Sequence, residues 1–398
     1  MALVNADVPH EIFRAMDIPY VVNQWWASVV SAKQKSAQYL GSLRERGYPD
    51  DSEQYNALAL ASAFDRDPEQ APWGGLPLPT IVVAEAYGDA MPKVFELWAL
   101  EHGAAFYPLE KTVLTEDPDP RWWERVQDDW EALIGSERID LLVDELKGLI
   151  RFLEQTTGRI FDETRFRRVM LLANEQAAFN AAARDLVART TPAPISITDS
   201  IPAVMLPQWH RGTEWGRDAA RTFFEEVEAR VEQGEAAYPG ERMRLMWVGR
   251  GLWFNLGFYQ FFQERFGAVF VWSMYLAIAA DGYIRRGADP LRTLAGRFAA
   301  FTEQLNAPPW NAAWFVKEAH HNQIDGVIHL AGGAQRGAYF VTRALEEAGF
   351  PVFQIDADNV DARNWNEEAL KDNLSAFLEH RVAARAYARL AAARPAAT

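Results

Sequence analysis

The sequence predicts an α/β protein with two Rossmann-like parallel-sheet domains and a helical segment between them. Apolar, partly β-branched runs occur near both ends of the chain, helical runs separate them, and the middle third has none. Strands that alternate with helices favour parallel pairing, because each helix returns the chain to the same end of the sheet. We therefore expect an N-terminal α/β domain at 1–115, a mainly helical domain at 116–240 and a C-terminal α/β domain at 241–398.

The first domain contains two apolar runs that we interpret as strands, at 18–22 and 80–86. The second run is continuous, which is typical of a strand buried on both faces. Residues 31–47 are helical in composition and end at a glycine, and a second helix at 91–102 leads into the apolar run at 104–110.

The middle domain should be mostly helical. Asp119 and Pro120 form an N-cap and first-turn pair that predicts the start of a long helix. Helical composition continues through 162–189, breaks at the proline-containing stretch 190–202, and resumes at 213–235. Within 137–156, apolar residues recur every three or four positions and predict one amphipathic helix: Ile139, Leu142, Val143, Leu146, Leu149, Ile150 and Leu153.

The third domain returns to alternation. We expect four strands at 243–249, 268–275, 326–332 and 351–356, with helices between them and a last helix over 366–391. Ligands bind outside the carboxyl ends of the strands in open parallel sheets. Two such units facing each other would therefore share a ligand crevice.

Composition excludes several classes of function. The chain of 398 residues has a formal net charge of −15, which argues against nucleic acid as a main partner. It shows neither a secretory signal nor an apolar stretch of about 18–20 residues, so we expect a cytoplasmic protein without a membrane span. It contains no cysteine, which excludes disulfides, thiolate-bound zinc and an iron–sulfur cluster held by its own thiolates.

Polar residues offer few catalytic patterns. His320, His321 and His329 suggest a metal site, but adjacent helical side chains point about 100° apart, so a polar helix end is the better interpretation and no metal is expected. The glycines in 247–257 do not match a dinucleotide fingerprint. The acidic residues after the last strand, Asp356, Asp358 and Asp361, together with Arg363, should cap a helix or fix loops rather than act in catalysis.

Long stretches of the chain resemble the 2-hydroxyacyl-CoA dehydratase family, which includes the class I benzoyl-CoA reductase subunits. The similarity extends from Pro9 to Leu378 and is carried by "GGLPLPTIVVAEAYGDAMPKVFELW", "RLMWVGRGLWFNLGFYQFFQERFGAVFVWSMY" and, most specifically, "DGVIHLAGGAQRGAYFVTRALEEAGFPVFQIDADNVD". The resemblance implies two Rossmann-like domains and a helical one. It also implies heterodimers that hold a [4Fe–4S] cluster with three cysteines and that act on CoA thioesters.

The three cysteine positions of that family fall at Glu53, Gly88 and Ala334 in this chain. None of these residues can replace a thiolate as an iron ligand, so no [4Fe–4S] cluster is expected here. The glycine-rich loop around Ala334 nevertheless keeps the strand, turn and helix pattern that allows close approach of the backbone.

The stretch "NQWWASVVSAKQKS" at 23–36 suggests an acyl-CoA pocket. Tryptophans there would line an apolar acyl site, serines would donate to a thioester carbonyl, and Lys33 or Lys35 would lie near phosphates. The alternative is that the tryptophans are core and the lysines solvated. The candidate substrate-binding residues are Trp25, Trp26, Ser28, Ser31, Lys33, Gly332, Gly333, Gln335 and Arg336; the catalytic residues stay unassigned.

The favoured hypothesis is a cluster-free subunit of a dehydratase-like complex, a lyase-type enzyme, that shapes an acyl-CoA pocket beside a paralogous, cluster-bearing subunit. A second hypothesis is a non-redox enzyme that acts on a CoA thioester in the repurposed crevice. A third is a non-catalytic acyl-CoA-binding protein.

Overall fold

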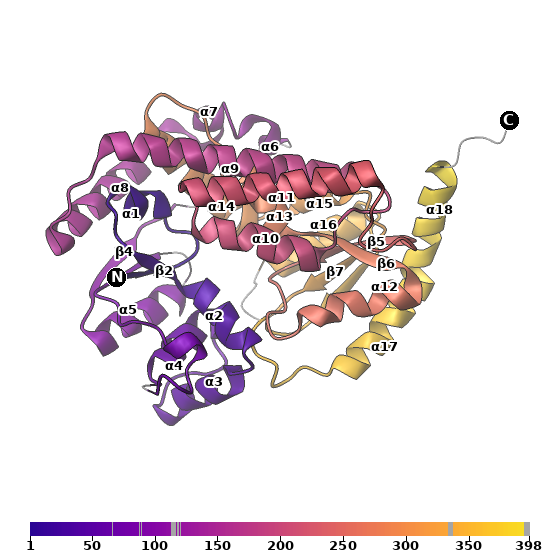
Figure 1. Ribbon diagram of the computed structural model, residues 1–398, viewed down its shortest axis with the longest axis horizontal. Coiled ribbons are helices and arrows are strands. Elements are labelled where there is room, and N and C mark those ends of the chain that lie inside the picture. The colour runs from indigo at the N-terminus through magenta and orange to yellow at the C-terminus, as the bar shows by residue number, and fades with distance from the viewer. Residues whose placement is uncertain are drawn as a thin grey trace.

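The computed structural model describes residues 1–65, 67–86, 88, 90–112, 117, 119, 121–332 and 337–393. The chain forms two four-stranded parallel sheets with surrounding helices and a helical segment between them in sequence (Figure 1). The predicted α/β fold class is therefore confirmed.

The N-terminal sheet consists of β1 (Ala2–Val4), β2 (Tyr20–Val22), β3 (Ile81–Glu85) and β4 (Ala105–Leu109) in the order β2-β1-β3-β4. Leu3 of β1 pairs with Val21 on one side and Val82 on the other, and all pairs are parallel. All five residues of β3 are buried, as the continuous apolar run predicts. The short central strand β1 was not predicted.

Helices of this unit are α1 (His10–Ala15), α2 (Asn23–Ala32), α3 (Ser36–Glu45), α4 (Gln54–Ala63), α5 (Ala90–His102) and the 3₁₀ turn η1 (Pro72–Gly74). The helix predicted over 31–47 is wrong at its start, because α2 ends at Ala32 and a new helix begins at Ser36. Gln34 between them has a φ of 59°, which an α-helix cannot contain.

The helical segment contains α6 (Trp122–Arg125), α7 (Trp130–Ile134), α8 (Ser136–Thr157), α9 (Glu163–Arg189), α10 (Ile197–Trp209) and α11 (Glu214–Gln233). The predicted amphipathic helix is α8, and its apolar stripe is buried. The prediction that Asp119 opens a long helix is wrong. Asp119 accepts a hydrogen bond from the Arg121 amide at 2.9 Å, but α6 has four residues, and Gly135 with a φ of 96° separates α7 from α8.

The break predicted at 190–202 is too long, because α10 begins within it. Ser196 and Asp199 form a capping box at its start, and Pro202 and Pro207 lie inside the helix. Proline in a helix interior removes a hydrogen bond and normally ends the helix. Here the burial of Ile197, Ile201 and Val204 stabilises the helix despite that cost.

The C-terminal sheet consists of β5 (Met243–Val248), β6 (Ala268–Ser273), β7 (Gly326–Leu330) and β8 (Val352–Ile355) in the order β6-β5-β7-β8. All four strands were predicted, and all pairs are parallel. Its helices are η2 (Leu256–Gln260), α12 (Phe261–Phe266), α13 (Met274–Asp281), α14 (Pro290–Asn306), α15 (Trp310–His321), α16 (Ala338–Glu347), α17 (Glu367–Phe377), η3 (Leu378–Val382) and α18 (Ala383–Ala393).

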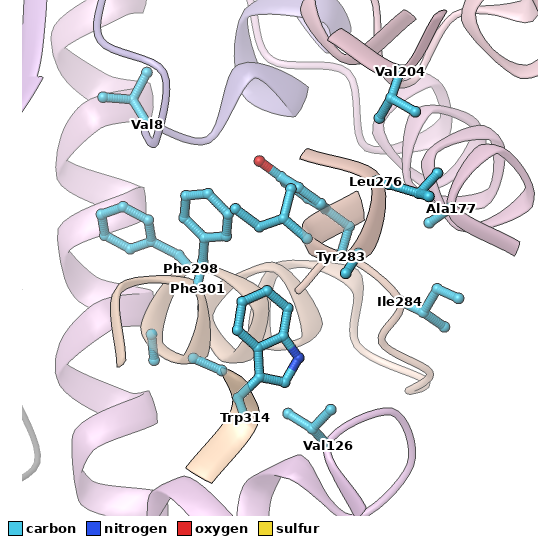
Figure 2. Packing of buried hydrophobic residues seen from close by; sticks show 14 of the residues in the cluster. Val8, Val126, Ala177, Val204, Leu276, Tyr283, Ile284, Phe298, Phe301 and Trp314 are labelled. Atoms are coloured by element: carbon cyan, nitrogen blue, oxygen red, sulfur yellow. The ribbon is translucent and has the colours of Figure 1, made fainter. Parts of the chain in front are cut away.

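One hydrophobic core extends through all three segments of the chain. It joins Val4 and Val83 of the N-terminal sheet to apolar residues of α8, α9, α13, α14 and α15. Figure 2 shows Phe298 and Phe301 of α14 beside Tyr283, whose hydroxyl group points away from Trp314. Within the part of the chain that the structure describes, no helix is both long and apolar enough to cross a membrane.

Candidate functional site

The two sheets have the same strand order, and their central strands end near each other. In each sheet the chain reverses its direction of winding between the first and third strands, β1 and β3 or β5 and β7. Ligands bind at such switch points, outside the carboxyl ends of the strands. Asp7 follows β1, and Arg250 follows β5, where its guanidinium lies 5.1 Å from the ring centre of Tyr55 in the N-terminal unit.

Further contacts join the two units here. Ser31 at the end of α2 donates to the carbonyl of Val360 at 3.1 Å. Gln34 donates to the carbonyl of Phe254 at 2.9 Å. We call this region, formed by the segments that follow the strands of both sheets together with α2 and α4, the strand-end junction.

The N-terminal side of the junction is a network of amides and buried charges. The Asn5 side chain accepts from the Glu85 amide at 3.0 Å, and Gln24 joins the Ala6 amide to the Asn56 side chain, with both hydrogen bonds 2.9 Å long. Glu85 forms a 2.8 Å ion pair with Lys111, and the side chains of both are buried. The bonds of Asn5 and of the Ala6 amide fix the backbone directly before Asp7.

The surroundings of Asp7 shift the pKa of its carboxyl group toward neutral pH. Burial, and after it the carboxylate of Glu85, raise its pKa to about 7, while Lys111, Arg211 and Arg250 oppose the rise. A carboxyl group that titrates near neutral pH can both accept and release a proton there, as a general acid or base must.

A small pocket lies on the other side of Asp7, where all three segments meet. Glu11 of α1 accepts from Arg211 and from Arg297 of α14, at 2.8 Å each, and all three side chains are buried. The two guanidinium groups hold the pKa of Glu11 at about 2 against the effect of burial. The pocket is lined by Asp7, Pro9, Glu11, Arg211, Tyr283, Leu294, Arg297, Phe298 and Phe301.

The two predicted tryptophans differ in their surroundings. Trp26 is 4 % exposed, and its indole N–H donates to Ser62 at 2.8 Å, which places it in the core of the N-terminal unit. Trp25 is half-buried and lies 5.6 Å, between ring centres, from Trp73. Trp73 itself is 64 % exposed, so Trp25 is the tryptophan of the pair that a ligand could reach.

The predicted serines are buried at the junction, and the lysines are not. Ser28 donates to the carbonyl of Gln24 at 2.8 Å and lies 3.0 Å from the hydroxyl of Tyr55. Lys33 is exposed at the end of α2, and Lys35 donates to Gln38. The structure thus brings Ser28 and Ser31 to the strand ends, whereas Lys33 points to solvent.

Gly332 is needed for close packing within the chain. A Cβ atom there would lie 2.7 Å from the carbonyl oxygen of Ala357, in the loop after β8. The close backbone approach that the glycine-rich loop predicts is therefore made to another strand-end loop. Gly333, Ala334, Gln335 and Arg336 lie outside the described residues.

The positions of the family cysteines do not fit a cluster held by thiolates. Glu53 lies directly before α4 with a φ of 51°, and its carboxylate accepts from Asn56 at 2.7 Å. Gly88 has a φ of 79°, and a Cβ atom there would meet nothing within 4 Å. One position carries an engaged carboxylate and the other no side chain, so neither offers a soft sulfur ligand.

The three histidines lie in different surroundings. The ring of His320 packs against Phe350, and His321 lies 3.1 Å from Asp185. His329, on β7, is bonded to Thr342 at 2.8 Å. Among the residues that the structure describes, no three His, Cys, Asp or Glu side chains gather closely enough to hold a metal ion.

The acidic segment after β8 fixes its own loop, as predicted. Asp358 accepts from the amides of Val360 and Asp361, at 2.8 and 3.0 Å. Arg363 binds Asp361 and reaches across the junction to Asp50.

Sequence reasoning missed Asp7 and Arg250 as site residues. Asp7 follows a three-residue strand that is too short to be recognised from its pattern. Arg250 lies between Gly249 and Gly251 directly after a predicted strand, and that was a usable signal. A charged residue in a tight turn at a strand end is a candidate ligand contact.

The sequence matches a known protein family over most of its length. The model of the family described as 2-hydroxyglutaryl-CoA dehydratase, D-component, matches residues 5–380. The chain belongs to this family. Two relatives are the alpha subunits of (R)-phenyllactyl-CoA dehydratase from Clostridium sporogenes and of (R)-2-hydroxyisocaproyl-CoA dehydratase from Clostridioides difficile.

The first relative is 26 % identical over 261 residues, which cover 64 % of this chain and 62 % of the relative. The second is 22 % identical over 257 residues, which cover 63 % and 62 %. The match to each relative thus spans less than two thirds of its length. The resemblance to the dehydratase family seen in the sequence is confirmed.

Proposed function

We propose that this member of the D-component family is a cluster-free subunit of a 2-hydroxyacyl-CoA dehydratase-like complex. It shapes an acyl-CoA pocket at the strand-end junction, beside a paralogous subunit that carries the cluster. The observation that carries the proposal is family membership across residues 5–380 in a chain without cysteine. Both relatives described above are named as alpha subunits, which supports the need for a partner.

The site chemistry supports a thioester ligand. Trp25 on α2 offers an apolar surface, and Ser28 of the same helix and Tyr55 add two hydroxyl groups that lie 3.0 Å apart. Binding pockets for organic ligands combine such apolar walls with a few fixed polar groups.

The test is reconstitution with a cysteine-bearing family member encoded beside this chain. Co-expressed under anaerobic conditions, the two chains should elute as one complex in size-exclusion chromatography and bind acyl-CoA in calorimetry. The proposal fails if the chains do not associate and this chain, alone or mixed, binds no acyl-CoA.

A second candidate is a non-redox enzyme that acts on a CoA thioester, and Asp7 favours it. A carboxyl group with a pKa of about 7 at a switch point is suited to remove a proton from the carbon next to a thioester carbonyl. The proton moves to Asp7, and the electron pair of the C–H bond moves toward the thioester oxygen.

This alternative is tested aerobically, without iron, by following exchange of that C–H hydrogen in D₂O by NMR. Exchange by the wild type that falls roughly a hundredfold or more in Asp7→Asn supports it, since general base catalysis contributes about 10²–10⁴ in rate. Binding without exchange would instead indicate a non-catalytic acyl-CoA-binding protein.

A further inference from the structure

Arg250 lies in a turn whose backbone is fixed on both sides. The indole of Trp247 donates to the Arg250 carbonyl at 2.8 Å. The next two amides, of Gly251 and Leu252, donate to the hydroxyl groups of Tyr275 and Tyr259, at 2.9 Å each. Three buried aromatic side chains are thus committed to one short turn.

This tight turn requires a glycine at position 249. Its φ is 100°, and a Cβ atom would lie 2.5 Å from the carbonyl oxygen of Leu330 at the end of β7. The turn therefore packs directly against the neighbouring strand end, and Arg250 projects from a rigid position at the switch point.

A buried or half-buried guanidinium is normally paired with a carboxylate, and the structure describes no such partner for Arg250. It is half-buried and lies over the Tyr55 ring, but it forms no ion pair or hydrogen bond with another side chain that the structure describes. Three arginines that also lie where segments of the chain meet, Arg211, Arg297 and Arg363, each bind a carboxylate. Asp7 and Asp358 act on Arg250 only beyond ion-pair distance.

A second donor, the hydroxyl of Tyr275, faces the same turn and donates to no group that the structure describes. The hydroxyl of Tyr275 accepts the Gly251 amide, and burial raises its pKa well above the usual value, so it keeps its proton. Five guanidinium N–H donors and one phenol donor therefore stand at the switch point of the C-terminal sheet.

We propose that Arg250, held by this turn and assisted by Tyr275, is the recognition residue for an oxyanion of the ligand at the strand-end junction. Its planar donor pattern matches a carboxylate or a phosphate, which accept two parallel hydrogen bonds. The inference deepens the proposed function and rests on it for the CoA ligand. The oxyanion comes either from a carboxylate on the acyl group or from a phosphate of CoA.

Calorimetry with three probes separates these sources: glutaryl-CoA, the uncharged five-carbon valeryl-CoA, and free CoA. A carboxylate source gives the wild type a preference for glutaryl-CoA over valeryl-CoA of roughly ten- to a hundredfold, and Arg250→Gln abolishes it. A phosphate source gives a similar loss in Arg250→Gln for all three probes. Arg250→Lys keeps the positive charge but not the two parallel N–H donors, so it should bind the probes that contact Arg250 with intermediate affinity.

The matched control is Arg46→Gln. Arg46 also lies over an aromatic ring, 3.9 Å from the centre of Phe64, but it is exposed at the end of α3. This variant should bind every probe as the wild type does, and circular dichroism checks that all variants fold. Arg250→Gln binding all three probes with wild-type affinity would overturn the inference and leave the acyl-CoA pocket standing.

If the wild type binds none of the three CoA probes, the acyl-CoA pocket itself has failed. Glutarate and inorganic phosphate then decide the role of Arg250 on their own. Thermal stabilisation by either anion that disappears in Arg250→Gln supports an oxyanion site, and its absence in the wild type overturns the inference.

Discussion

The N-terminal and C-terminal sheets share one strand order but end in different chemistry. At the carboxyl ends of β1 and β3, the N-terminal unit has the side-chain amide of Asn5, the Glu85–Lys111 ion pair and Asp7. At the carboxyl ends of β5 and β7, the C-terminal unit has a glycine-containing turn that is fixed by aromatic side chains and contains Arg250. The same topology therefore presents a titratable acid from one side of the junction and a fixed cation from the other.

The largest expected effect comes from breaking the buried ion pairs by which Glu11 joins the N-terminal unit to the rest of the chain. Glu11→Ala leaves Arg211 and Arg297 buried without their shared carboxylate, and should lower the free energy of unfolding by about 3–5 kcal/mol. Urea denaturation measures it. Glu347→Ala, which removes an exposed ion pair with Arg343 on α16, is the control and should cost about 0–1 kcal/mol. Equal effects of the two variants would contradict this role of Glu11.

A smaller change in stability is expected from Asp7→Asn, which tests the raised pKa of Asp7. The pKa of Asp7 rises from 3.8 to about 7 on folding, so the folded state binds this proton more tightly than the unfolded state. The associated stability is complete below pH 3.8 and is lost as the pH rises through 7. Asp7→Asn should therefore be more stable than the wild type at pH 8, by roughly 2–4 kcal/mol.

Denaturation at several pH values between 5 and 8 checks this sign. The advantage of Asp7→Asn should shrink as the pH falls, because the wild-type carboxyl group becomes protonated. Glu11 behaves in the opposite way, since its pKa of about 2 gives stability that is lost only as the pH falls below 4.5. A difference between Asp7→Asn and the wild type that is constant over this range would contradict the raised pKa.

The smallest effect compares a glycine from each side. Gly249→Ala meets both a positive φ and the Leu330 carbonyl oxygen, whereas Gly88→Ala meets a positive φ in open space. Backbone strain of this kind costs about 1–3 kcal/mol, and the contact adds to it only at Gly249. Thermal denaturation should thus rank Gly249→Ala as the less stable variant. The reverse order would show that the turn before Arg250 is not rigid.

Much of the fold could be predicted from the sequence because several strands, β3, β5, β6 and β7, are buried throughout. The run 80–86 and the four C-terminal runs are apolar enough to be recognised locally. The strand β1 could not be predicted, since three residues show no period, and its place in the centre of the sheet comes from pairing with two distant strands. The helix α10 was obscured by its prolines.

The candidate site was predicted less well than the fold. Ser28 and Ser31 do lie at the junction, and the predicted meeting of the strand ends agrees with contacts such as Ser31 to Val360. Trp26 lies in the core and Lys33 in solvent, because the face that each residue presents depends on how α2 packs against α4.

The sequence by itself determined the α/β class, the family and the lack of thiolate ligands, because these follow from local patterns and from which residue types are present. Only the tertiary structure placed Asp7 and Arg250 at facing switch points. Their neighbours come from sequence positions far apart, such as Glu85 and Lys111 for Asp7 and Tyr55 for Arg250. Burial and charge depend on those neighbours, so the chemistry of this site is a property of the folded chain.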